Sequence, residues 1–306
     1  MPLSTSRRLA LVTSASLALL AGCGSSSDST GAKSTPARLA VVASTNVYGD
    51  IARRIGGDRV DVTSVISDPD QDPHSYEADP QNQLALSKAK VVVENGGGYD
   101  DFVDRMLKSG HNDSAEVINA VRVSGRTAPK GGELNEHVWY DVPTVAKVAD
   151  RISAALAKTD PDDAAAFEKN AAAFKAKLAP LEAREARIKK THGGEQVAIT
   201  EPVPLYMIEA SGLVNRTPPQ FSEAIEEGDD VSPRILQESL ALFSGKKVKA
   251  LVYNEQTSGP QTEKAEAAAK AAGIPVVPVT ETLPKGEDYL GWMTANVDAL
   301  AGALAK

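Results

Sequence analysis

The chain has 306 residues, of which 42% are hydrophobic and 24% charged. This composition is ordinary for a globular protein and excludes collagen, simple disorder and a polytopic membrane protein. The formal net charge is −8 at pH 7, and no long basic run could follow a phosphate backbone, so we expect no nucleic-acid partner. The length favours two domains, each able to bury a core. The single cysteine, Cys23, excludes an intrachain disulfide framework and a zinc site built from cysteines.

The N-terminus has the pattern of a signal peptide. Arg7 and Arg8 form a short positive segment, residues 9–21 are apolar, and small residues stand directly before Cys23. The apolar stretch is too short to be a membrane-spanning helix, because it would extend about 20 Å across a bilayer core about 30 Å thick. We therefore interpret residues 1–22 as a signal peptide.

The end of this segment, Leu20-Ala21-Gly22-Cys23, resembles a bacterial lipobox. The resemblance implies that Cys23 is acylated by membrane lipid and becomes the first residue of the mature protein. Residues 23–36 are mostly small and polar, which predicts a flexible tether. The protein is therefore expected outside the cytoplasm, anchored to the cell membrane as a lipoprotein.

From residue 37 onward, short apolar runs alternate with helical stretches, which is typical of parallel sheets flanked by helices. In the first half, the expected strands are residues 39–43, 60–66, 90–94 and 116–120, and the expected helices are 47–55, 80–89 and 99–108. In the second half, the expected strands are 196–200, 248–253 and 275–279, and the expected helices are 233–243, 261–272 and 287–304. The sequence thus predicts an α/β fold with two lobes, each with a small, mostly parallel sheet.

A long helical region separates these two halves. Residues 141–157 have a helical pattern, and residues 160–190 are rich in Ala, Lys and Glu, which are strong helix formers. The charged run 182–190 is typical of a solvent-exposed face. We therefore expect an N-terminal lobe, a rigid connector helix and a C-terminal lobe at residues 37–158, 159–192 and 193–306.

The sequence has only four histidines. His111 and His192 lie in polar, turn-like segments and are interpreted as solvated loop residues. His74 lies between an expected strand and the next helix, and His137 lies just before a helix. Either could be an ordinary surface histidine, but both occupy the loop edge where open α/β folds bind ligands.

Three carboxylates occupy the matching edge of the second lobe. Glu201 directly follows the expected strand 196–200, Glu281 follows 275–279 with one Thr between, and Glu255 follows the strand that ends near Asn254. Each alone could be a capping or surface carboxylate. Two imidazoles from one lobe and two carboxylates from the other would, however, form a site for a first-row divalent metal ion.

Three segments resemble the metal-specific, zinc and manganese, solute-binding proteins of bacterial ABC importers: Asp72-Pro-His-Ser-Tyr-Glu, Asn135-Glu-His-Val-Trp-Tyr-Asp and Thr200-Glu-Pro-Val-Pro-Leu-Tyr. The resemblance covers about residue 37 to the end. It implies a C-clamp of two α/β lobes bridged by one long helix, with one divalent ion held at the lobe interface as transported ligand. It further implies a monomer that delivers this ion to the membrane permease of an ABC importer. The implied metal ligands are His74, His137, Glu201 and Glu281.

Two departures from the family pattern bear on the metal. The fourth ligand of the family is usually aspartate, whereas the matching stretch here is Val279-Thr-Glu-Thr-Leu, so Glu255 remains an alternative to Glu281. Zinc-type members often have histidine in place of Glu201 and a His-rich loop before the second ligand, which residues 123–136 lack. Both differences favour manganese, yet two imidazoles and two carboxylates also bind Zn²⁺ well. The choice between Mn²⁺ and Zn²⁺ stays open.

Two other functions fit parts of this pattern. A metal-dependent extracellular hydrolase would need a general base beside a metal-bound water, yet no His-Glu-x-x-His helix is present. The glycine run at Gly96 lacks the Lys-Ser/Thr of a phosphate loop. We therefore expect no enzyme. A lipid-anchored surface adhesin is the other alternative.

Overall fold

The computed structural model describes residues 38–68, 76, 79–130 and 132–306. The expected signal peptide, Cys23, the tether and His74 lie outside the described residues. Residues 37–306 form one compact unit, and the following description concerns this unit alone. Within the described part of the chain, no helix combines the length and the apolar character needed to cross a bilayer.

The first sheet is fully parallel and has the strand order β2-β1-β3-β4. Its strands are β1 (Leu39–Thr45), β2 (Val60–Ile66), β3 (Val91–Glu94) and β4 (Glu116–Asn119), flanked by α1 (Asn46–Gly56), α2 (Pro80–Lys88), α3 (Phe102–Ser109) and α4 (Ala120–Ser124). Val41 pairs with Val62 on one side and with Val91 on the other. All four residues of β3 are buried, as expected for a central parallel strand covered by helices on both faces.

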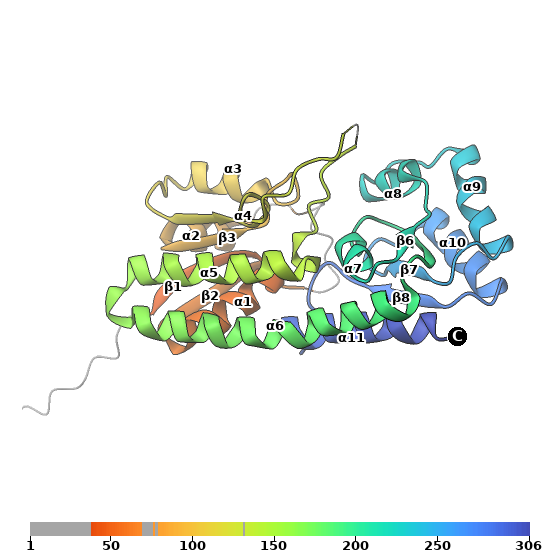
Figure 1. Cartoon of the computed structure of the whole chain (residues 1–306). Coiled ribbons are helices and arrows are strands. Elements are labelled where there is room, and N and C mark those ends of the chain that lie inside the picture. The colour runs from red at the N-terminus through yellow and green to blue at the C-terminus, as the bar shows by residue number, and fades with distance from the viewer. Residues whose placement is uncertain (1–37, 69–75, 77–78, 131) are drawn as a thin grey trace, which may run out of the picture. The chain divides into compact units, whose positions relative to one another are not determined.

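The second sheet is also parallel, with the strand order β6-β5-β7-β8 (Figure 1). Its strands are β5 (Gln196–Ile199), β6 (Val214–Asn215), β7 (Leu251–Asn254) and β8 (Val276–Val279), and its helices are α7 (Leu205–Ala210), α8 (Pro219–Glu226), α9 (Pro233–Ser244), α10 (Pro260–Ala271) and α11 (Tyr289–Leu304). The start of α9 follows its sequence signal, because Pro233 is the first helical residue and the Ser232 hydroxyl accepts a hydrogen bond from the Ile235 amide.

A long helix links the two sheets. After α5 (Val142–Thr159) and the 3-10 turn η4 (Pro161–Asp163), α6 runs continuously over Ala164–His192. It packs against α1 and α5 at one end and against α7 and α11 at the other, as Figure 1 shows. Its buried residues form a stripe along one face: Phe167, Ala171, Phe174, Leu178, Leu181, Glu185 and Ile188. The charged run 182–190 is mostly solvent-exposed as expected, but Glu185 and Ile188 are buried and Arg184 is half-buried.

One hydrophobic core extends through both halves of the unit. It includes Val41 and Val93 of the first sheet, Phe174 of α6, and Ile199 and Val252 of the second sheet. Two smaller clusters lie at the outer sides of the two sheets. The expected fold of two small parallel sheets joined by a long helix is confirmed. Strand β6 and helices α4 and α8 were not expected from the sequence.

Candidate metal centre

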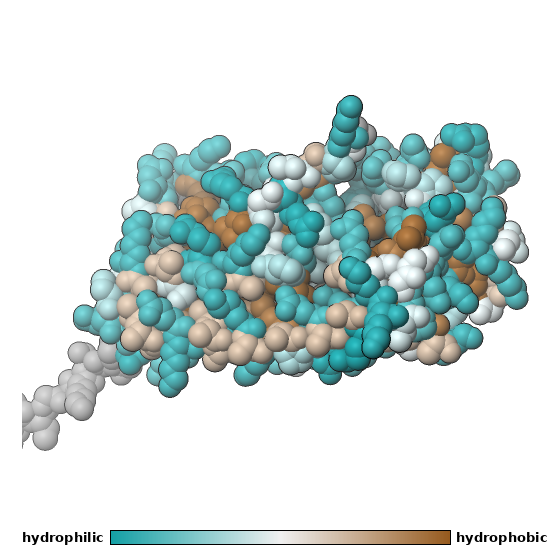
Figure 2. Space-filling view, in the orientation of Figure 1, coloured by the Kyte–Doolittle hydropathy of each residue, from teal (hydrophilic) through white to brown (hydrophobic). Residues whose placement is uncertain are grey.

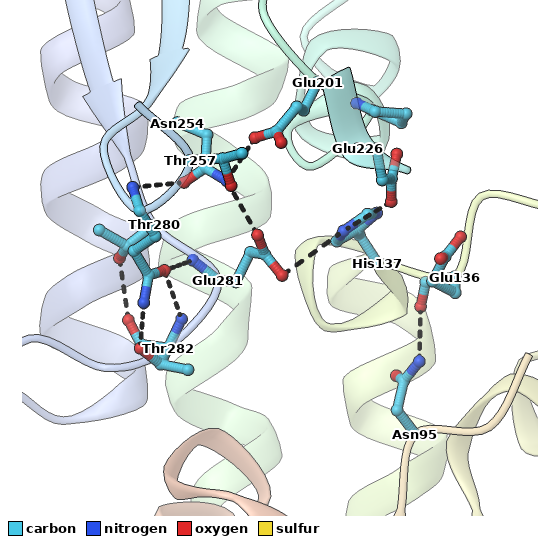
Figure 3. Close-up of polar contacts among 12 residues, drawn as sticks. Asn95, Glu136, His137, Glu201, Glu226, Asn254, Thr257, Thr280, Glu281 and Thr282 are labelled. Carbon is cyan, nitrogen blue, oxygen red and sulfur yellow. Dashed lines mark hydrogen bonds and ion pairs between the residues drawn. The ribbon is translucent and has the colours of Figure 1, made fainter. Parts of the chain in front are cut away.

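The candidate site lies where the carboxyl ends of the second sheet face the loop before α5. Glu201 stands two residues after β5, Asn254 is the last residue of β7, and Glu281 stands two residues after β8. The carboxyl ends of parallel strands meet at one edge of a sheet, which is where open α/β folds bind ligands. From the other side, His137 precedes the 3-10 turn η3 (Val138–Tyr140), and Figure 3 shows its ring pointing toward these carboxylates.

His137 is fully buried and held in a defined orientation. The Asn135 side-chain oxygen accepts a hydrogen bond from the His137 backbone amide at 3.1 Å and lies 2.7 Å from Nδ1 of the ring. Because this oxygen can only accept, Nδ1 carries the proton and Nε2 of the neutral ring carries the lone pair. The amide nitrogen of Asn135 donates to the Pro202 carbonyl at 3.1 Å, which supports this assignment. Nε2 is therefore the ring nitrogen that would coordinate a metal ion.

Aromatic rings pack around this histidine. Trp139 and Tyr99 both meet the His137 ring edge-on, with centroid distances of 5.0 and 5.9 Å. Burial, together with the negative charge of Glu281, raises the pKa of the Tyr99 phenol well above its ordinary value. Tyr99 therefore stays neutral, and the rings of Tyr99 and Trp139 form an aromatic wall beside the His137 ring.

The end of β3 supports the loop that carries His137. Asn95 donates a hydrogen bond to the Glu136 carbonyl at 3.0 Å and accepts one from the Tyr48 hydroxyl at 2.5 Å. The Asp100 carboxylate accepts hydrogen bonds from the Asn95 and Gly96 amides at 2.6 and 2.7 Å. Gly96 has φ +77, and a Cβ atom there would overlap the Asn119 side chain, so this turn requires glycine.

The two carboxylates of the second sheet are oriented by one amide. Nδ2 of Asn254 donates to Oε2 of Glu201 at 2.5 Å and to Oε1 of Glu281 at 2.8 Å. Both glutamates are only 2% exposed. The Glu281 amide donates to Gln256 Oε1 at 2.5 Å, which fixes the backbone at this point. Oε2 of Glu281 then lies 4.0 Å from Nε2 of His137 (Figure 3).

Two further carboxylates complete the cluster. Oε1 of Glu226, the last residue of α8, lies 3.4 Å from Nε2 of His137. Ligand atoms of Glu136, His137 and Glu226 all lie within 4.8 Å of one another. Burial, followed by the charges of Glu136, Glu201 and Glu281, raises the pKa of Glu226 to about 10. Burial also raises the pKa of Glu136 to about 7. Four acids around one imidazole disfavour one another's ionisation, and a divalent cation bound among them would favour their charged forms.

The structure brings together three of the four residues expected to bind the metal. His137, Glu201 and Glu281 converge, whereas His74 lies outside the described residues. Glu255 is exposed, and its backbone amide pairs with Val279. His111 is exposed in a turn, and His192 at the end of α6 lies beside Glu195. Both histidines were expected to be loop residues away from the site.

Three residues of the site, Glu136, Asn254 and Glu226, are not predicted from the sequence. Asn254 had a usable signal, because it ends an expected strand at the same sheet edge as Glu201. Glu226 had none, since the helix that carries it was not expected and its neighbour Glu227 offers an identical side chain.

Hydrogen bonds tie the two ligand-bearing edges together. The Tyr206 hydroxyl donates to the Asn135 carbonyl at 2.6 Å, and the Tyr140 hydroxyl donates to the Thr280 carbonyl at 2.7 Å. Arg126 stacks over the Tyr206 ring at 4.6 Å and pairs with Asp141 at 3.0 Å. The acceptors of the two tyrosine hydrogen bonds, Asn135 and Thr280, lie within two residues of the proposed ligands His137 and Glu281. The distances between the ligands are therefore set by direct contacts as well as by the long helix.

Comparison with known proteins places this arrangement in a family. The family model described as zinc-uptake complex component A, periplasmic (ZnuA), matches residues 41–303. The manganese ABC transporter substrate-binding lipoprotein scaA of Streptococcus gordonii is 26% identical over 307 aligned positions, which cover 94% of this chain and 95% of the relative. The manganese-binding lipoprotein MntA of Bacillus subtilis is 29% identical over 306 positions, covering 93% and 95%.

A solved structure shows the same fold. The periplasmic zinc binding protein TroA from Treponema pallidum matches with a TM-score of 0.75 at 21% identity, over 88% of this chain and 100% of TroA. The resemblance inferred from the sequence is thus confirmed, and the family model spans both sheets and the connector helix. The chain belongs to the ZnuA family of periplasmic metal-uptake components.

Proposed function

We propose that this protein captures one divalent transition metal ion between its two sheets and delivers it to the permease of an ABC importer. The ion is cargo and is held by His74, His137, Glu201 and Glu281. The observation that carries the proposal is the convergence of an oriented, buried imidazole nitrogen with two buried carboxylates from the opposite sheet.

The donor set suits a cation with two charges. A neutral imidazole and two carboxylates, with a second imidazole from His74, give two nitrogen and two oxygen ligands. The burial of His137, Glu201 and Glu281 strengthens the electrostatic attraction to the ion, because little water screens these groups. His74 enters on sequence grounds alone, through Asp72-Pro-His-Ser.

The ion is Mn²⁺ or Zn²⁺. Carboxylate oxygens favour Mn²⁺, whereas affinity at equal availability favours Zn²⁺. The names of the relatives divide in the same way, since scaA and MntA are named for manganese and TroA for zinc. The ligand set therefore supports both metals.

The protein acts outside the cytoplasm as a monomeric lipoprotein, anchored to the membrane through acylated Cys23. The Leu20-Ala21-Gly22-Cys23 stretch supports this, and both relatives above are named lipoproteins. A receptor that delivers its cargo to a permease has no need of catalysis, which fits a family of uptake components.

Metal analysis of the mature protein tests the proposal. The wild type, stripped with a chelator and reloaded with Mn²⁺ or Zn²⁺, is expected to retain one equivalent after dialysis. His137→Ala is expected to retain none, because it removes a buried ligand, whereas the exposed His111→Ala is expected to match the wild type. Retention of one equivalent by His137→Ala would show that the site is misassigned.

A further inference from the structure

We propose that the Glu226 carboxylate binds the same metal ion as an additional ligand, and that this oxygen shifts the preference of the site toward Mn²⁺ over Zn²⁺. The inference rests on the proposed function, which assigns the ion to this site. Glu226 was not among the four residues implied by the sequence, and it comes from a different element, the end of α8.

The geometry around His137 carries the inference. Two atoms that each lie about 2.1 to 2.2 Å from one ion are about 3.0 to 3.6 Å apart when the angle between them is 90 to 110°. Oε1 of Glu226 and Nε2 of His137 are 3.4 Å apart, within this range. Oε2 of Glu281 is 4.0 Å from the same nitrogen, so that carboxylate needs an angle of about 130 to 145° at the ion or an inward movement. By this measure Glu226 is at least as well placed as Glu281 to share an ion with His137.

The packing of two neighbouring residues in α8 fixes the position of Glu226 beside His137. Phe221 and Ile225 of α8 are buried in the outer core of the second sheet, which fixes the orientation of the helix. As a result, Glu226 is directed toward His137 with its side chain only 12% exposed, while the next residue, Glu227, is exposed to solvent. Figure 3 shows the Glu226 carboxylate directed at the His137 ring.

This position is unfavourable for a carboxylate unless a cation is bound. Glu226 is the last residue of its helix, where the helix dipole is negative and disfavours a negative charge. It also lies near three other acids, Glu136, Glu201 and Glu281. An arrangement that costs stability in the metal-free state is understandable if these charges are used to bind a divalent cation.

An additional carboxylate has a different effect on the two metals. Zn²⁺ prefers four ligands in a tetrahedron and accepts nitrogen readily. Mn²⁺ prefers hard oxygen ligands and larger, octahedral coordination. With His137, Glu201 and Glu281, the Glu226 carboxylate makes three of the four described donor groups carboxylates. The Glu226 oxygen should therefore contribute more to Mn²⁺ affinity than to Zn²⁺ affinity.

A matched pair of variants tests this. Glu226→Gln and Glu227→Gln each replace a carboxyl group by an amide at adjacent positions while keeping the side-chain size. Competition titrations with a chromophoric chelator would give the affinities for Mn²⁺ and Zn²⁺. We expect Glu226→Gln to weaken Mn²⁺ binding at least tenfold more than Zn²⁺ binding, and Glu227→Gln to leave the ratio of the two affinities unchanged.

The outcomes separate this inference from the proposed function. If Glu226→Gln behaves like Glu227→Gln, or weakens both metals equally, the inference is overturned. His137→Ala, measured in the same series, tests the proposed function independently of that result. A crystal structure of the Mn²⁺-loaded wild type provides a second test that needs no variant. A Glu226 oxygen within about 2.5 Å of the ion is expected, and one beyond the coordination shell would overturn the inference.

Discussion

At the scale of single residues, the site depends on amides that orient the ligands. Asn135 fixes which nitrogen of His137 carries the proton, and Asn254 joins the carboxylates of Glu201 and Glu281 through one nitrogen atom. Such partners typically change metal affinity by about 10- to 100-fold when they are removed. Neither type of contact can be seen in a sequence, because Asn254 and Glu281 are brought together only when β7 pairs with β8.

The choice between Glu281 and Glu255 gives a direct test at this scale. Glu281→Gln keeps the side-chain size but removes a buried charge, so metal affinity should fall by more than about 100-fold. Glu255→Gln changes an exposed side chain and should lower the affinity little. Isothermal titration of the two variants side by side with Mn²⁺ and Zn²⁺ would measure the difference. A larger loss in Glu255→Gln would reverse the assignment of the fourth ligand.

At the scale of elements, most strands and helices could be predicted, whereas the two-residue strand β6 and the helices α4 and α8 could not. Strand β3 has three consecutive valines, and α6 is rich in strong helix formers, so the local pattern and the tertiary environment agree. Helix α8 has eight residues, which are too few to show a clear helical repeat of hydrophobic residues. Its stability depends on the burial of Phe221 and Ile225. Glu226 was missed for this reason.

The connector helix contains one buried acid, Glu185, which gives a prediction about pH. Its side chain is 4% exposed, and its Oε1 makes no hydrogen bond to any described residue. Burial, followed by the charges of Glu182 and Asp141, raises the pKa of Glu185 to about 8. The folded protein therefore holds this proton to higher pH than the unfolded chain does, so the free energy of unfolding falls as pH rises from about 4.5 to about 8.

Glu185→Gln removes this ionisation. We expect the metal-free variant to be more stable than the wild type at pH 8.5, by on the order of 2 kcal/mol, with the advantage absent near pH 4.5. Urea unfolding at several pH values would measure it, with Glu168→Gln, an exposed position on the same helix, as the control. An equal stability difference at both pH values would contradict the assigned pKa.

At the scale of the described unit, the two sheets share a core as well as a site. The largest hydrophobic cluster includes residues from both sheets and from α5, α6 and α11. Asn46 exchanges two hydrogen bonds with Leu283, and Arg54 pairs with Asp288 at 2.6 Å. In the space-filling view, mostly hydrophilic residues cover the visible face (Figure 2). Extensive packing between the halves favours metal release through local movement of ligand loops over wide opening of a hinge.

At this scale the two-sheet architecture could be predicted from the sequence, but the set of residues that form the site could be predicted only in part. The alternation of strands and helices, the connector and the family segments indicate two sheets and an ion between them. The separation of ligand atoms could not be predicted, because His137 and Glu226 lie in different lobes and meet only through tertiary packing. The position of a residue in the sequence indicates whether it lies at a sheet edge. Only the tertiary structure shows which of these residues meet at the candidate metal site.

Anomalous diffraction from crystals of the metal-loaded mature protein would test the central claim most directly. Data collected at the absorption edge of Mn or Zn locate the ion without reference to any variant. One strong peak is expected between the two sheets, with Nε2 of His137 and carboxylate oxygens of Glu201 and Glu281 within about 2.5 Å. A peak elsewhere on the molecule, or no peak between the sheets of a protein that retains one equivalent of metal, would contradict it.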